Sequence, residues 1–398
     1  MKKNTLILSF TLLVVMLGYG MVMPIMPFYI EKLGVGGTEL GWLMSTYSLM
    51  QLICAPLWGI LSDRIGRKPV ISIGVLGYAI TLLFFGLSNT YWMLFIARTL
   101  SGILSSATMP TAMAYIGDNA PEKERSKGMG QLGAMMGVGV IAGPLLGGLL
   151  SADSLSLPFF IGSGMAFAAF LLTIFALPES HKMLPISGKK SGLSWKTLRP
   201  VVLSPAGVLL LLVFMMSFGM SNFQGITGLY VVEKFDFNTK QVGTIWMVMG
   251  AMMILVQGVL TGPLTRRFGD QTLIHAGLAG GALGFLVMTA ASDYITILAA
   301  LGFFSVWLAI ISPVLNARMS VFAGNQQGTV MGMNSAASSL GRVIGPLWAG
   351  YLYDFKMEYP YWSGAAVLLL GLLVSWSFGL RREVKAEAMG AAESEIGE

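Results

Sequence analysis

Residues 5–29 read TLILSFTLLVVMLGYGMVMPIMPFY, a largely apolar stretch without a charged side chain that follows Met1-Lys2-Lys3-Asn4. A helix that crosses a bilayer needs about 20 mostly apolar residues, so this stretch is long enough to span one. A cleavable signal peptide would have a shorter apolar region that ends at a small-residue cleavage site, whereas this stretch continues through Pro24 and Pro27. We therefore predict a permanent first transmembrane helix.

The composition of the whole chain gives the same prediction for its full length. Of 398 residues, 55% are hydrophobic and 11% are charged, and the mean hydropathy is +0.73. Water-soluble domains carry about 25% charged residues. The lipid bilayer is therefore the first predicted partner, and the chain is expected to be an all-α membrane protein.

Twelve apolar segments are obtained when the chain is divided at its charged and Pro- or Gly-rich interruptions. Each has about the length of a transmembrane helix. Their approximate ranges are 5–29, 40–62, 70–88, 92–116, 128–150, 157–177, 202–231, 241–264, 272–291, 295–317, 328–352 and 361–380.

The distribution of Lys and Arg predicts the orientation of these spans. Two of the 25 cationic residues, Arg98 and Arg342, fall inside spans, and nineteen of the rest lie on one side of the membrane. Because cytoplasmic loops are enriched in Lys and Arg, we expect both termini in the cytoplasm. The net charge of +6 is explained in this way, and no basic run predicts a nucleic-acid partner. The four cations on the other side are Lys32, Lys234, Lys240 and Lys356.

Several classes of site are excluded by residue counts. One cysteine, Cys54, and two histidines, His181 and His275, provide neither a disulfide framework nor a metal site. The chain has no Gly-x-x-x-x-Gly-Lys-Ser/Thr loop for ATP, so an ion gradient or the substrate's own gradient must supply the energy of any transport. A membrane-embedded enzyme such as a lipid acyltransferase would need a cluster of catalytic groups, which two separated histidines do not supply. We predict no metal, no cofactor and no catalytic residue.

The longest polar interruption divides the chain in half. It runs from Glu179 to Pro200 and contains a Ser-Gly-Lys-Lys-Ser-Gly segment. The predicted organisation is an N-terminal six-helix bundle at 1–178, a cytoplasmic linker at 179–200, a C-terminal six-helix bundle at 201–380 and a cytoplasmic tail at 381–398.

The two halves match each other at an offset of 202 or 203 residues. Because six spans return the chain to the same side of the membrane, the repeats are parallel, an arrangement typical of transporters that rock two bundles about a central site. The matched pairs are Glu31-Lys32 with Glu233-Lys234, Gly41 with Gly243, Gly59 with Gly262, and Gly143-Pro144 with Gly345-Pro346.

A charged loop joins the second and third spans, where residues 59–68 read GILSDRIGRK. One interpretation is a tight turn whose cations merely obey the charge rule for cytoplasmic loops. The other is a conformational latch of Asp63, Arg64, Arg67 and Asp118, in which Asp63 caps a helix of the other half and Arg67 pairs with Asp118.

This loop resembles the signature loop of the major facilitator superfamily, Gly-x-x-x-Asp-Arg-x-Gly-Arg-Lys. Residues 262–270, GPLTRRFGD, resemble the same motif in degraded form, because they lack an acid at the position equivalent to Asp63. The resemblance implies the major facilitator fold, with twelve transmembrane helices in two parallel six-helix repeats, and any latch is expected to be asymmetric.

Span five is rich in glycine, and residues 139–148 read GVIAGPLLGG. Such small-xxx-small spacing permits close helix packing, and proline can bend the helix. The segment also resembles the motif of exporters in the superfamily, and Leu17-Gly18 with Pro24-Ile-Met-Pro27 resembles a pattern of its twelve-span drug/proton antiporters. The predicted hinge and packing residues are Gly139, Gly143, Pro144, Gly147 and Gly148.

The predicted substrate site consists of polar and aromatic side chains within otherwise aliphatic spans. A buried Arg is costly unless a cavity or a partner solvates it, so Arg98 is a functional candidate. It also matches an Arg that the superfamily links to proton transfer, whereas for Arg342 a structural pairing is at least as plausible. Half of the set could instead bridge helices or anchor the membrane interface. The predicted residues are Gln51, Arg98, Asn222, Phe223, Gln224, Tyr230, Trp246, Phe303, Trp307, Asn316 and Asn334.

No predicted span contains an Asp or Glu in its interior, although a carboxyl group there is the usual proton carrier of a proton-coupled pump. All 19 acids fall in loops or at span ends, and Asn222-Phe-Gln224 and about Ala309 stand where related pumps place a Glu and an Asp. Coupling could then use acids at span ends, the substrate could carry the exchanged charge, or transport could be uncoupled. The proton-coupling candidates are Arg98, Glu31, Glu233 and Asp118.

The resemblance to exporters and drug/proton antiporters of the superfamily implies a secondary exporter of small lipophilic or amphiphilic compounds, a multidrug efflux pump that confers antibiotic resistance. We expect proton antiport by alternating access, a monomer, and a location in a bacterial cell membrane. Export of a native metabolite such as a sugar or a lipid is the alternative, and a membrane-embedded enzyme is the alternative from another class.

Overall fold

The structure is a computed structural model that describes residues 2–180, 205–323 and 327–377. The predicted tail and almost all of the predicted linker lie outside these residues. Within them the chain is helical and has no strand. The helices are α1 (Lys2–Lys32), α2 (Gly37–Ile65), α3 (Arg67–Leu87), α4 (Tyr91–Ser105), α5 (Thr108–Asn119), α6 (Glu122–Leu150), α7 (Leu157–Ala176), α9 (Pro205–Phe235), α10 (Thr239–Leu255), α11 (Thr261–Phe268), α12 (Asp270–Ala290), α13 (Tyr294–Ala323), α14 (Gln327–Tyr353) and α15 (Tyr359–Ser377), with a π-helical turn, Val256–Leu260, between α10 and α11.

Ten helical segments of the described chain are long and apolar enough to cross a membrane. The other two predicted spans differ for physical reasons. The fourth is broken after Ser105 into α4 and α5, and the eleventh, α14, is long enough but carries Asn334, Ser335, Ser338 and Arg342. Polar side chains are tolerated at membrane depth where they face a cavity, so α14 is a candidate lining helix.

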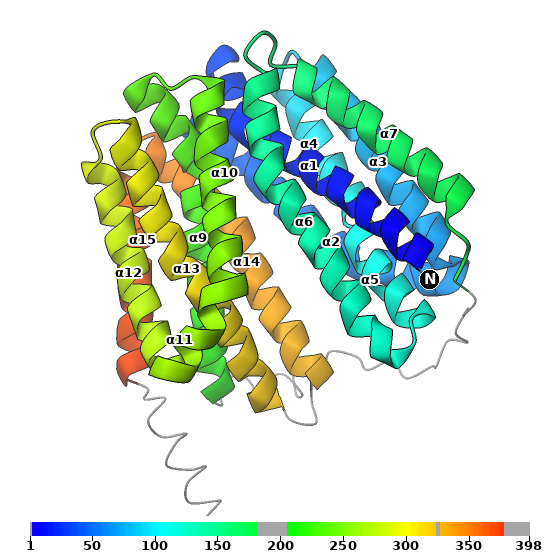
Figure 1. Cartoon of the computed structure of the whole chain (residues 1–398). Helices are drawn as coiled ribbons and strands as arrows, with labels where there is room; N and C mark the ends of the chain where they lie inside the picture. Colours follow the sequence, from blue (N-terminus) through cyan, green and yellow to red (C-terminus); the bar gives the residue numbers. More distant parts are fainter. Residues whose placement is uncertain (1, 181–204, 324–326, 378–398) are drawn as a thin grey trace, which may run out of the picture.

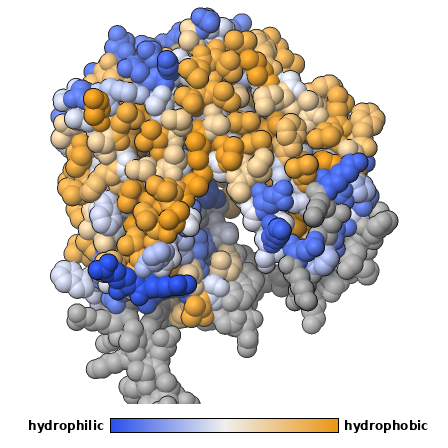
Figure 2. All heavy atoms as spheres, viewed as in Figure 1, coloured by the Kyte–Doolittle hydropathy of each residue, from blue (hydrophilic) through white to orange (hydrophobic). Residues whose placement is uncertain are grey.

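The outer surface is that of a protein surrounded by lipid. Figure 2 shows apolar side chains over the flanks of both bundles and hydrophilic ones toward the two ends. Large apolar side chains such as Phe175 and Trp376 are 83% and 68% exposed. A water-soluble monomer rarely exposes contiguous apolar surface on this scale, so these flanks face the bilayer.

The two halves repeat the same packing. In the first half α1 packs on α6 and α3 packs on α7, and in the second half α9 packs on α14 and α12 packs on α15. Even the turns match, because Gly66 before α3 and Gly269 before α12 both have a positive φ, of 100° and 76°, which favours glycine. The predicted fold of two parallel six-helix repeats is confirmed.

The two bundles meet at one end and diverge toward the other (Figure 1). We call the diverging end, where α1 begins and the α2–α3 turn lies, the basic end. The meeting end, where α1 ends and α2 begins, is the seam end. Two helix pairs join the halves there, α2 with α14 and α6 with α10.

Glycines bring the α2 and α14 backbones into contact at the seam end. A Cβ atom on Gly41 would lie 2.5 Å from the Pro346 carbonyl oxygen, closer than real Cβ atoms come to any neighbour. Gly37 meets Gly350 in the same way. One helical turn further along α2, the Ser45 hydroxyl donates to the Val343 carbonyl oxygen over 2.6 Å.

The pair α6 and α10 repeats this contact with the halves exchanged. A Cβ on Gly243 would lie 2.5 Å from the Pro144 carbonyl oxygen, and Gly148 abuts the backbone of Thr239. The residues matched by the internal repeat, Gly41 with Gly243 and Pro144 with Pro346, therefore occupy equivalent contacts. We call these two glycine contacts the glycine seam.

The remaining predicted glycines of span five pack within the first half. Gly139, Gly143 and Gly147 recur every fourth residue on the face of α6 that lies against α1, and their Cα positions leave no room for a side chain. The backbones of α6 and α1 therefore lie close together at these glycines. A hinge at Pro144 stays a prediction.

A carboxylate closes the seam end further. The Asp354 side chain, which directly follows α14, accepts hydrogen bonds from the backbone N–H groups of Gly37 over 2.7 Å and Thr38 over 3.0 Å, and from the Thr38 hydroxyl. The two N–H groups lie in the first turn of α2, where they have no acceptor within the helix and where the helix dipole favours an anion. Asp354 thus caps a helix of the other half.

We predict that Gly243→Ala prevents closure of the seam end. Its methyl group would overlap the Pro144 carbonyl oxygen, and overpacking of this kind costs about 1–3 kcal/mol. Opening is measured as faster maleimide labelling of Ser45→Cys, a position 2% exposed in the other seam contact, in a Cys54→Ser background. Gly164→Ala, which meets no atom within 4 Å, is the matched control. Equal labelling in both variants would contradict the prediction.

Asp354→Asn should open the same end by a smaller amount. The amide keeps the shape of the side chain but loses the charge that the α2 N-terminus stabilises. For an exposed carboxylate this charge is worth about 0.3–1 kcal/mol, or about a 2- to 5-fold change in the ratio of open to closed states. The labelling assay at Ser45→Cys measures it, with the exposed Asp153→Asn as control. If labelling does not change, Asp354 is not part of the closure.

Candidate substrate-binding site

A cavity of about 480 Å³ lies between the bundles on the basic side of the glycine seam. Gln51, Leu52 and Pro56 of α2 line one wall, and Ser335 and Ser339 of α14 line the wall opposite. Figure 2 shows the corresponding hollow between the two lobes.

The same two helices make both the seam and the cavity. In α2 the seam residues Gly37, Gly41 and Ser45 precede the cavity residues, which begin at Tyr47. In α14 the order is reversed, because the cavity residues end at Arg342 and the contact with Gly41 follows. The cavity is therefore sealed toward the seam end and extends toward the basic end.

Three smaller cavities adjoin this one through shared residues. Cavities of about 200 Å³ and 50 Å³ both include Arg342, and the 50 Å³ cavity and another of about 80 Å³ both include Tyr19. Tyr19 and Arg342 also line the main cavity. These two side chains lie where the cavities meet.

The Arg98 guanidinium is buried beside this junction. Its side chain is 2% exposed, its Cζ lies 4.4 Å from the ring centre of Tyr47, and its Nη2 contacts the Met44 sulfur at 3.5 Å. Tyr47 in turn contacts the Tyr19 ring and accepts a 2.9 Å hydrogen bond from the Gln51 amide. A cation–π contact stabilises a desolvated Arg but does not neutralise it.

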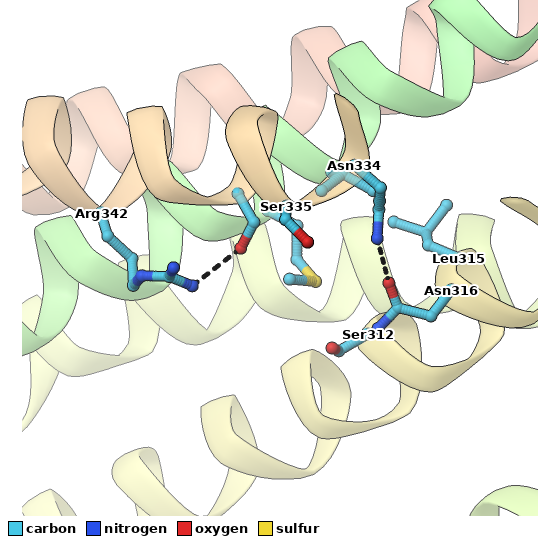
Figure 3. A pocket seen from close by; sticks show the side chains of 9 residues that line it. Ser312, Leu315, Asn316, Asn334, Ser335 and Arg342 are labelled. Atoms are coloured by element: carbon cyan, nitrogen blue, oxygen red, sulfur yellow. Dashed lines mark hydrogen bonds between the residues drawn. The ribbon is translucent and has the colours of Figure 1, made fainter. Parts of the chain in front are cut away.

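Arg342 reaches the cavity from the second half. Its guanidinium donates to the Ser338 and Ser339 hydroxyls over 2.9 Å and 2.8 Å, both on its own helix. Its side chain is exposed and lines the 200 Å³ cavity that Figure 3 shows. Two of its five N–H groups are used in this way, so others are available to a ligand.

None of the four cavities has an Asp or Glu in its lining. Among the described acids near the bundle ends, Glu31 is exposed at the end of α1, and Glu233 accepts a 2.7 Å hydrogen bond from Tyr353. Asp118 pairs with Arg67 at the basic end. The structure thus places these proton-coupling candidates away from Arg98.

Six of the predicted site residues line these cavities. Gln51 lies in the main one, and Arg98 and Gln224 share the 50 Å³ cavity. Trp246 of α10 and Gln224 line the 80 Å³ cavity. Asn334 of α14 donates to Asn316 of α13 over 2.7 Å in the 200 Å³ cavity, as Figure 3 shows.

Three predicted residues of α9 lie instead in the core of the second bundle. Phe223 is fully buried and stacks on Phe304 with ring centres 3.9 Å apart. Asn222 donates to the Pro360 carbonyl oxygen over 3.1 Å, and Tyr230 packs edge-on against Tyr361. These three side chains bridge α9 to α13 and α15, so the prediction that they line the pocket is wrong for this conformation.

The aromatic pair of α13 also lies away from the cavities. Phe303 is 36% exposed, and Trp307 packs against Gly280 of α12 with its ring 6.0 Å from that of Phe303. Neither lines any of the four cavities.

One ion pair of the predicted latch is present, and the latch itself stays a prediction. Arg67 pairs with Asp118 over 2.9 Å, as expected, and also with Asp63 over 2.6 Å. All three belong to the first half, whereas Asp63 was expected to cap a helix of the second. In this conformation the cap between the halves is made by Asp354 at the opposite end. Arg64 has an exposed side chain at the end of α2, and its latch role stays a prediction.

Sequence reasoning missed Tyr19 and Tyr47 and ranked Arg342 too low. The sequence did contain a signal for these three residues, because each places a polar group inside a predicted span. The sequence did not show which face of each helix turns toward the cavity. Tyr47 lies four residues before the predicted Gln51 and therefore on the same face of α2.

Comparison with known proteins agrees with this geometry. The sequence profile described as Major Facilitator Superfamily matches residues 8–269 and 209–395. Multidrug resistance protein 2 of Bacillus subtilis is 32% identical over 376 residues, which cover 93% of this chain and 94% of that protein. The chain belongs to the Major Facilitator Superfamily.

Further members of this transporter superfamily are similar over nearly the whole chain. Quinolone resistance protein NorA of Staphylococcus aureus is 28% identical over 381 residues, covering 94% of this chain and 96% of that one. Among solved structures, a bacterial homologue of the human lysosomal transporter Spinster, in an inward-facing and occupied conformation, has a TM-score of 0.76 at 13% identity and covers 94% of this chain and 95% of its own. A peptide transporter, POT, also has a TM-score of 0.76, at 14% identity, and covers 94% of this chain and 93% of its own. At these identities the structural likeness shows the superfamily fold.

Replacement of Arg98 by Ala should lower transport by this superfamily member at least about tenfold, because it removes a buried charge that orients Tyr47 beside the cavity. Arg98→Lys should restore part of the activity, since a point charge replaces a planar group stacked on a ring. Dye efflux is measured in cells with equal amounts of membrane-inserted, monodisperse protein. Unchanged efflux in Arg98→Ala would reduce this side chain to a packing role.

Proposed function

We propose that this protein exports small lipophilic or amphiphilic compounds by alternating access, with proton antiport as the source of energy. One observation carries the proposal. A cavity between two pseudo-symmetric bundles is closed at one end by the glycine seam and Asp354 and continues toward the other end. Rocking of the two bundles about such a site gives cargo access to one side at a time.

The lining suits cargo with an apolar body and few polar groups. Met16, Leu52 and Met109 supply adaptable apolar surface, and Gln51 and Tyr19 supply hydrogen-bonding groups. Unbranched thioether side chains adapt to ligands of different shape, which is a property of promiscuous sites. The relatives named for multidrug and quinolone resistance support the same substrate range.

The predicted orientation sets the direction of access. With both termini in the cytoplasm, the basic end faces the cytoplasm, and this conformation would load cargo from inside. The Lys and Arg residues that predict this orientation include Arg64, Arg67 and Lys68 of the α2–α3 turn.

Coupling in this proposal does not pass through a carboxyl group in the cavity, since none lines it. Either acids at the span ends, Glu31, Glu233 and Asp118, exchange the proton, or Arg98 does so with water, or the cargo carries the charge. Moving one charge through about 150 mV supplies roughly 3.5 kcal/mol, enough for a gradient of a few hundredfold.

Everted membrane vesicles with an imposed pH gradient test the proposal. Ethidium, a quinolone and tetracycline are added one at a time, and at least one is expected to dissipate part of the gradient in vesicles that contain this protein. Vesicles with the seam variant Gly243→Ala, which is expected to close poorly, should respond less. If none of the three dissipates the gradient while the purified protein still binds one of them, proton antiport is wrong.

A further inference from the structure

The junction of the cavities has a positive charge that no lining residue balances. Arg98 and Arg342 both line the 50 Å³ cavity, together with Tyr19 and Tyr47. The two guanidinium groups come from opposite bundles, Arg98 on α4 and Arg342 on α14. No Asp or Glu lines this cavity or the main one.

Arg98 has unused hydrogen-bonding capacity at this junction. Among the described residues, its Nε–H has no hydrogen-bond partner, although the side chain is 2% exposed. Buried polar groups are normally satisfied, and a buried guanidinium is normally paired with an acid. The Met44 sulfur and the Tyr47 ring are weak substitutes for an oxyanion.

The main cavity continues from this junction as a mixed surface. Leu52, Met109 and Pro110 provide an apolar wall, and Arg342 and Tyr19 belong to both this cavity and the junction. A molecule that occupies both would place a charged group between the two arginines and an apolar body beside these residues.

We propose that the protein binds amphiphiles that carry one oxyanion group, held between Arg98 and Arg342, with their apolar part in the main cavity. Guanidinium groups recognise carboxylates and related oxyanions through paired N–H donors. A cation without such a group meets two positive charges in a region of low dielectric and is disfavoured. The inference rests on the proposed export function, because it names the substrate class of the same cavity.

The position of the two arginines gives the anion a second effect. Arg98 and Arg342 belong to bundles that rock against each other, so an oxyanion that contacts both would bridge the bundles and offset their mutual repulsion. An anionic cargo would therefore favour the conformation in which the two arginines share one cavity. A ligand shifts such an equilibrium only by its differential affinity for the two states.

A pair of dyes that differ in one group tests the proposal. Rhodamine B carries a free carboxylate, and its ethyl ester has the same ring system without that charge. Fluorescence anisotropy on the full-length protein in detergent should give a Kd for rhodamine B at least about tenfold lower than for the ester. Equal or tighter binding of the ester would overturn the proposal.

Variants of Arg342 and of its surroundings test the origin of the preference. Arg342→Gln should weaken rhodamine B about tenfold and leave the ester within about twofold, so that binding of the ester also shows that the variant is folded. Arg342→Lys should keep part of the preference. Gln224→Glu, which adds an acid to the cavity that contains Arg98, should reverse it. Arg125→Gln, an exposed Arg on α6, is the control and should change nothing. An unchanged preference in Arg342→Gln would overturn the proposal.

The oxyanion can come from a soluble compound or from a lipid headgroup, and competition separates the two. Displacement of rhodamine B by naphthoate indicates a soluble carboxylate, and displacement by dihexanoyl phosphatidylglycerol alone indicates a lipid. Displacement by neither overturns the proposal.

Transport in proteoliposomes separates this inference from the export function. If rhodamine B and the ester are exported equally well and Arg342→Gln changes the export of neither, export is correct and the anion site is wrong. If rhodamine B binds with the expected preference but is not moved, the anion site is correct and export is wrong.

Discussion

Contact between bare backbones at the glycine seam is the constraint on which the other features depend. Gly41 against Pro346 and Gly243 against Pro144 bring helices of opposite halves closer than any side chain would allow. In lipid, helices gain little from burying apolar surface, so close packing of small residues is a main source of association. The seam therefore decides which end closes, and where it ends along α2 and α14 decides where the cavity begins.

The polarity of α14 follows from this geometry. A helix surrounded by lipid must be apolar, but α14 has one face on α9, seam contacts near its end and a cavity beside its first half. Ser335, Ser339 and Arg342 occupy the cavity face, where water or cargo can solvate them. That is why this helix has the length of a span without the hydropathy of one. The broken fourth span, α4 and α5, likewise contributes Ser105 and Ser106 to the lining.

The sequence predicts spans, repeats and close contacts well because each depends on local composition or on matched positions. Gly41 and Gly243 were paired by their offset alone, and the structure places them in equivalent contacts. Side-chain direction was harder to predict. Phe223 and Gln224 are neighbours, yet one is in the bundle core and the other lines two cavities. Apolar residues occur on every face of α9, so the hydrophobic periodicity does not show which face turns toward the cavity, and tertiary packing alone decides it.

A carboxylate makes the main polar contact at each end of the molecule, but only the one at the seam end joins the two halves. At the seam end the Asp354 carboxylate caps the α2 N-terminus of the other half, whereas at the basic end Asp63 pairs with Arg67 inside its own half. A carboxylate at a helix N-terminus contributes on the order of 1 kcal/mol, which is comparable to the difference between two conformations that must both be populated. A transporter needs each closure to be this weak. If either end were held by a large apolar interface, the bundles would stay in one state, and cargo could not be released on the other side.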